Sequence, residues 1–200
     1  MPETFEYALE RLYEDQDRDW VVDAIPAVLA WHSGAAGSWR GEPLEVQVAY
    51  TTGARRRSRP VTLAVTCDIE KLRRHDPEVQ SKADRYRTGR TVHREHLTET
   101  AAYGLAFVAI SVFLPGRRVV TMRRHCPPDI VLDSTPGALR GVEVAGRATG
   151  GNAELRATRE GKTGVIGKSP QLREMPDVAE AWLSLWCRTP RVSEMYQVKP

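Results

Sequence analysis

The chain has 200 residues, of which 41% are hydrophobic and 28% are charged, and its formal net charge at pH 7 is +3. This length and composition suit a soluble globular protein with a sizeable core, built as one large domain or two small ones. The small positive charge is compatible with a nucleic-acid partner, but it is no evidence for one, because solubility alone explains such a value.

The cysteines Cys67, Cys126 and Cys187 are isolated and far apart in the sequence. This spacing argues against a zinc site and against a disulfide framework, and it favours a reducing compartment. The first residues lack the basic and apolar regions of a signal peptide, and the longest apolar stretch, 101–114, is too short and interrupted to span a bilayer. We therefore expect a cytoplasmic protein that does not associate with a membrane.

The first 84 residues predict an N-terminal region of helices and one β-hairpin. Apolar residues at helical spacing predict helices over 3–14 and 18–32, and Pro26 must start or bend the second. Alternating apolar residues predict strands over 44–50 and 61–66, which pair as a hairpin.

The tip of this hairpin is basic, since it carries Arg55, Arg56, Arg57 and Arg59. One interpretation is a solvated loop that keeps a strand edge soluble, and the other is a finger that contacts phosphates. The following segment, 69–90, predicts a short helix and then a linker, with a soft domain boundary near residue 85.

The pattern changes after this boundary. We expect one long helix over 91–114, then strands over 117–124, 129–133 and 141–147, and a short helix over 153–160. Residues 85–175 thus form a predicted core, and 176–200 a predicted C-terminal helix and tail. Trp182 and Trp186 lie on that last helix, where they either pack in a core or form a face for a protein partner or a homodimer.

Two acids lie near the predicted strands. Asp129 begins one strand, and Glu143 lies inside the next, between two valines. If these strands pair through the turn at 134–138, the two carboxylates can lie side by side on one face. A carboxylate in an apolar strand is costly unless it is paired or binds a cation, so we suspect a metal site. Glu95 and Glu99, four residues apart on the preceding helix, could supply a third acid.

The order helix, strand, strand, strand, with acids on the helix and on the last two strands, resembles the core of the PD-(D/E)xK nuclease superfamily. Pro128-Asp129 matches the "PD" of the motif, Glu143 matches its second acid, and Glu99, or else Glu95, matches the helix acid that some members use. The resemblance covers about residues 91–160, and its motif is short and degenerate. It implies an α+β or α/β fold with a restriction-endonuclease-like core of helix, three-stranded meander and helix.

The chain departs from the family at the lysine, because Ala145 stands where Glu-x-Lys places it. Arg147 points to the same strand face as Glu143, but an arginine side chain keeps its proton and so cannot act as a base. Some members move the lysine to the following helix. Lys162 is then the nearest candidate, with Lys168 behind it.

The resemblance implies a phosphodiesterase that cuts nucleic acid with Mg²⁺ or Mn²⁺. Asp129 and Glu143 would bind the metal, Glu99 would help, and Lys162 would be the displaced lysine. The residues expected to contact nucleic acid are Arg55, Arg56, Arg57, Arg123, Arg124 and Arg147. The alternative is a catalytically inactive nuclease-fold subunit that binds nucleic acid or a protein partner in a larger complex.

Overall fold

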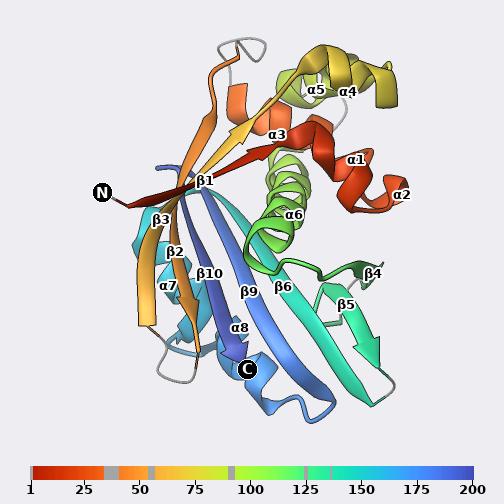
Figure 1. The fold of residues 1–200 in the computed structure, drawn as a ribbon. Coiled ribbons are helices and arrows are strands. Elements are labelled where there is room, and N and C mark those ends of the chain that lie inside the picture. The colour runs from red at the N-terminus through yellow and green to blue at the C-terminus, as the bar shows by residue number, and fades with distance from the viewer. Residues whose placement is uncertain (1, 34–40, 54–56, 90–92, 124–125, 136) are drawn as a thin grey trace.

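The computed structural model describes residues 2–33, 41–53, 57–89, 93–123, 126–135 and 137–200. These residues form three layers, in which one mixed eight-stranded sheet lies between two sets of helices (Figure 1). The expected mixed α/β class is confirmed.

The strands of the main sheet stand in the order β1-β3-β2-β10-β9-β6-β5-β4. Neighbours are parallel in the pairs β1–β3, β2–β10 and β6–β9, and antiparallel in the others. A small separate antiparallel pair is formed by β7 and β8. The strands are β1 (Glu3–Ala8), β2 (Leu44–Thr52), β3 (Arg57–Thr66), β4 (Val119–Met122), β5 (Ile130–Thr135), β6 (Ala138–Thr149), β7 (Gly161–Lys162), β8 (Val165–Ile166), β9 (Val178–Thr189) and β10 (Val192–Lys199).

The helices cover both faces of the sheet. The larger apolar cluster lies between the sheet and α3, α5 and α6, and a smaller one lies between the sheet and α7 and α8 (Figure 1). The helical segments are η1 (Leu9–Arg11), α1 (Leu12–Asp15), α2 (Arg18–Val21), α3 (Ala24–Ser33), α4 (Ile69–His75), α5 (Val79–Thr88), α6 (Arg94–Phe113), α7 (Gly151–Glu160) and α8 (Lys168–Glu174).

Helix α6 runs through the larger cluster. Within the described residues, its segment Glu95–Phe113 is the one helix long and apolar enough to cross a membrane, and 67% of the apolar window is buried inside the protein. Such burial is typical of the core helix of a soluble protein, in agreement with the soluble character expected from the composition.

Several predicted elements are confirmed. The segment 18–32 forms α2 and α3, with Pro26 in the first turn of α3, and the hairpin of 44–50 and 61–66 is the pair β2 and β3. The long helix and the three strands after it are α6, β4, β5 and β6, and the short helix is α7.

Other predicted elements are wrong. The chain begins with β1, and only residues 9–15 of the expected first helix are helical. The expected linker after α4 is helix α5, so residue 85 lies within a helix, and strands from both sides of it share one sheet.

The C-terminal helix and tail predicted over 176–200 are instead the strands β9 and β10, near the middle of the sheet. Residues 181–187 are all buried because helices cover both faces of β9. A strand buried on both faces shows a continuous apolar run, which periodicity cannot distinguish from a helix. Trp182 and Trp186 are 3% and 1% exposed, so they pack in the core and offer no face to a partner.

Candidate functional site

Asp129 and Glu143 lie side by side where the β5–β6 ladder ends. The last pair of that end is Ile130 with Val142, which places Asp129 next to Glu143. The Asp129 N–H donates a hydrogen bond to Glu143 Oε2 at 3.2 Å, and the Val144 N–H donates to Asp129 Oδ2 at 2.8 Å. Carboxylate oxygens thus accept the backbone hydrogen bonds that carbonyl oxygens would accept if the ladder continued. The two acids that the sequence indicated therefore do lie together.

Glu143 is a buried charge. Its side chain is 2% exposed on the sheet face that α7 and α8 cover. Burial, and then the charge of Asp129, raise the pKa of the Glu143 carboxyl, while the ammonium of Lys168 acts in the opposite direction. The cost of burying this charge is the physical sign that the position serves more than packing.

The lysine that reaches Glu143 is Lys168. Its Nζ, at the start of α8, forms an ion pair with Glu143 Oε1. Lys162, the candidate nearest in sequence, is exposed and pairs with Glu154 on α7 at 3.1 Å instead. The structure therefore assigns the position beside Glu143 to the second of the two lysines.

Two glycines explain how the chain folds back to bring Lys168 to the sheet. Gly161 and Gly167 are so close that a Cβ on Gly167 would lie 2.3 Å from Gly161 N. The small pair β7–β8 fills the loop between them, and α8 begins directly after Gly167. Only glycine permits this approach, so the glycines that make the sequence look irregular are what place the lysine.

Tyr103 on α6 is the site residue that the sequence did not indicate. Its ring packs against the larger apolar cluster. Burial, followed by the charges of Asp129, Glu99 and Glu143, raises the pKa of this phenol. In the sequence of an apolar helix, a tyrosine near a functional site cannot be distinguished from a core residue. The one indication that Tyr103 lies near the acids is its position one helical turn after Glu99.

Of the two helix acids, Glu99 is the one whose charge acts on the Tyr103 phenol. Both side chains are exposed, and Glu99 is close enough to act on the Tyr103 phenol. Glu99 therefore remains the better candidate for the helix acid.

Only some of the arginines predicted to contact nucleic acid lie within the described residues. Arg123 donates from its guanidinium to Cys126 Sγ at 2.6 Å and from its N–H to the Asp129 carbonyl at 2.7 Å, so it belongs to the loop that carries Asp129. Arg147 is exposed and donates to Thr158 on α7 at 2.9 Å. Outside the described residues lie Arg55, Arg56, Arg124 and the side chain of Arg57.

Two carboxylates can be enough for a hard cation that keeps most of its water. In the part of the chain that the structure describes, no three or more His, Cys, Asp or Glu side chains are grouped so as to hold a metal ion. Magnesium is commonly bound through one or two carboxylates, with waters and substrate phosphates as the other ligands. Asp129 and Glu143 supply two carboxylates, of which Glu143 is paired with Lys168, and two are too few for a closed structural site.

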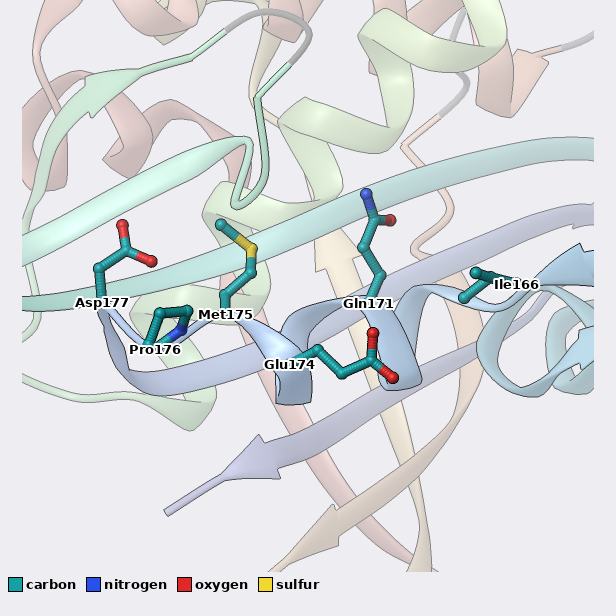
Figure 2. Close-up of a pocket in the computed structure, with 6 residues that line it drawn as sticks. All are labelled: Ile166, Gln171, Glu174, Met175, Pro176 and Asp177. Carbon is teal, nitrogen blue, oxygen red and sulfur yellow. The ribbon is translucent and has the colours of Figure 1, made fainter.

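A surface pocket of about 550 Å³ lies apart from these acids, at the C-terminal end of α8 (Figure 2). None of the site residues lines it. Gln171 and Met175 point to the same side of α8 in Figure 2, and the side chain of Glu174 runs sideways below Gln171. The lining residues are Ile166, Gln171, Glu174, Met175, Pro176 and Asp177.

Comparison with known proteins identifies no relative, because no family model, curated protein or solved structure matches this chain. The grounds for a function are therefore the arrangement and chemistry of the site itself.

Replacing Glu143 by glutamine should make the protein more stable at pH 8. Folding raises the pKa of the Glu143 carboxyl, so there is a pH range in which this group is protonated in the folded protein and ionised in the unfolded chain. The free energy of unfolding therefore falls as the pH rises through the pKa of the folded state. Glu143→Gln removes this loss, and each kcal/mol gained raises the melting temperature by about 2–4 °C in a chain of this size. Thermal melts from pH 4 to 8 measure the effect.

The matched control is Glu154→Gln, which removes a partly exposed carboxylate that also pairs with a lysine, Lys162. It should change stability little at any pH, because exposed ion pairs contribute little. A lower melting temperature for Glu143→Gln at pH 8 would mean that the pairing with Lys168 outweighs the cost of burial.

Proposed function

We propose that this protein is a metal-dependent nuclease of the PD-(D/E)xK type, which hydrolyses phosphodiester bonds of nucleic acid with Mg²⁺ or Mn²⁺. The observation that carries the proposal is the convergence of two carboxylates and one ammonium at the end of the β5–β6 ladder: Asp129, Glu143 and Lys168. Such a group has the ligands for a hard cation and a positive donor for a phosphate.

The order of elements supports the same proposal. The helix α6 is followed by the antiparallel meander β4–β5–β6 and by α7, and β9 then pairs in parallel with β6. This order supports the resemblance, which implies a helix, a three-stranded meander and a helix. Asp129 lies directly before the second of these strands and Glu143 lies in the third.

Asp129 and Glu143 would hold the metal, and Glu99 on the facing helix would add an acid for its water shell. When bound, the metal activates a water molecule and stabilises the charge of the phosphate at the transition state. Lys168 neutralises Glu143 in the free protein, and its ammonium would contact the phosphate or position the attacking water. Arg123 and Arg147 would contact the nucleic-acid backbone beside the site.

The proposal is tested by incubating single- and double-stranded DNA and RNA with the protein in Mg²⁺ or Mn²⁺. Asp129→Ala and Glu143→Ala should each lower cleavage by more than about 100-fold, because even residues that merely orient metal ligands contribute 10–100-fold. Glu154→Ala, a carboxylate away from the cluster, should cut like wild type.

Two outcomes would contradict parts of this proposal. Metal-dependent cutting that survives both substitutions would remove Asp129 and Glu143 from the site. A folded wild-type protein that binds nucleic acid but cuts none of the substrates would favour the inactive nuclease-fold subunit, for which Ala145 at the usual lysine position is the supporting observation.

A further inference from the structure

Both carboxylate oxygens of Glu143 have a partner in the free protein. Oε2 accepts a hydrogen bond from the Asp129 N–H at 3.2 Å, and Oε1 forms the ion pair with Lys168. A carboxylate oxygen can accept a second partner, but an ammonium already bound to Oε1 repels a metal ion that approaches the same oxygen. Of the two contacts, the one with Lys168 is therefore the one that a metal must replace.

The two members of this ion pair differ in their access to solvent. The side chain of Lys168 is 38% exposed, whereas that of Glu143 is 2% exposed. Lys168 is the first residue of α8, directly after the close contact of Gly161 with Gly167 that fixes where this helix begins. A lysine side chain has a flexible four-carbon stem, so the ammonium can change partners by rotation about its own bonds while α8 stays in place.

The charges of the cluster favour a particular exchange of partners. The carboxylates of Asp129 and Glu143 and the ammonium of Lys168 leave one negative charge unbalanced. A divalent cation alone overcompensates this charge and is repelled by the ammonium, and a phosphate alone is repelled by the carboxylates. A divalent cation and a phosphodiester together leave the cluster neutral, so each should favour the binding of the other.

We propose that Lys168 is a switch that couples metal binding to nucleic-acid binding. In the free protein its ammonium neutralises Glu143 and weakens metal binding at the site. When nucleic acid binds, the ammonium moves to a phosphate, and Glu143 becomes a metal ligand. This inference rests on the proposed function and adds to it a form of regulation, in which the protein binds metal tightly only when nucleic acid is present.

The test compares the affinity for Mn²⁺ of the protein alone with that of the protein bound to a phosphorothioate oligonucleotide, which keeps the phosphate charges and resists cleavage. Electron paramagnetic resonance of free Mn²⁺ measures both, after subtraction of the Mn²⁺ that the oligonucleotide binds by itself. The oligonucleotide should lower the dissociation constant for Mn²⁺ by about 5-fold or more, the lower end of the usual range for coupled sites. Because such coupling is reciprocal, Mn²⁺ should raise the affinity for the oligonucleotide by the same factor, which fluorescence anisotropy measures.

The variant Lys168→Met tests whether the lysine carries this coupling, because it keeps an unbranched side chain and removes the charge. Without oligonucleotide it should bind Mn²⁺ at least as tightly as wild type, and adding the oligonucleotide should then change that affinity little. The matched control is Lys162→Met, which removes an exposed lysine that pairs with Glu154 at the surface. This control should show the same coupling as wild type.

The outcomes separate the switch from the proposed function. If wild type binds no Mn²⁺ under either condition, or does not bind the oligonucleotide, the proposed function is wrong, and the switch is wrong with it. If wild type binds Mn²⁺ equally well with and without the oligonucleotide, or if Lys168→Met keeps the wild-type coupling, only the switch is overturned. An equal loss of coupling in Lys162→Met would assign the effect to the overall charge of this segment and would also overturn the switch.

Discussion

Replacing Lys168 by alanine should lower metal-dependent cleavage by about 100-fold or more, the usual contribution of a group that donates or accepts a proton at the reacting centre. Replacing Lys162 by alanine should leave the rate close to that of wild type. The two lysines are six residues apart, but only Lys168 contacts Glu143, whereas Lys162 pairs with Glu154 at the surface. The comparison of these two variants therefore tests which lysine replaces the one missing at Ala145.

The same pair of variants separates metal binding from catalysis. Without Lys168, the carboxylates of Asp129 and Glu143 lose the cation that neutralises them, so a divalent metal has less competition. We expect Lys168→Ala to bind Mn²⁺ at least as tightly as wild type while cutting far more slowly. Single-turnover cleavage at saturating Mn²⁺, together with calorimetry, measures both quantities.

Two results would count against this role. A Lys168→Ala variant that cuts at the wild-type rate would show that the ammonium serves only to neutralise Glu143. A loss of similar size in Lys162→Ala would show that the loop of β7 and β8 moves in the working protein.

The site could be predicted from sequence as far as its acids, and the reason is local. Asp129 and Glu143 belong to neighbouring strands joined by a short turn, so alternation and one hairpin suffice to bring them together. Lys168 and Tyr103 depend on how separate elements pack. The position of Lys168 follows from a contact between two glycines, and that of Tyr103 from the approach of α6 to β6, and neither leaves a periodic pattern.

Two parts of the sheet show why one pair of strands could be predicted from the sequence and another could not. In the β2–β3 hairpin apolar and polar residues alternate clearly, and this pattern predicts the two strands. Strand β9 is buried on both faces, so its continuous apolar sequence predicts a helix. Strand β10 buries Ser193 and Glu194, so its sequence predicts a polar tail. Glu194 can be buried because Arg159 on α7 pairs with it at 3.0 Å, a partner 35 residues away that the strand itself does not reveal.

Replacing Gly146 by alanine should destabilise the protein and weaken its metal site at the same time. The new Cβ would lie 2.6 Å from the Thr98 carbonyl oxygen, a backbone atom that cannot rotate away, so α6 must move off β6. Forcing an extra methyl group into a packed contact costs about 1–3 kcal/mol, which corresponds to a melting temperature lower by several degrees. Because Glu99 follows Thr98 directly on α6, the same movement should raise the dissociation constant for Mn²⁺.

Gly104→Ala provides the matched control, because it adds the same methyl group to the opposite contact of α6. There the Cβ would lie 2.6 Å from Val28 Cγ2 and 3.0 Å from Ala24 O, both on α3. This variant should also melt at a lower temperature, but it should bind Mn²⁺ like wild type, since the contact between α6 and β6 is unchanged. If both variants weaken Mn²⁺ binding equally, the loss reflects general destabilisation; if only Gly146→Ala does, the metal site depends on the contact of α6 with β6 at this glycine.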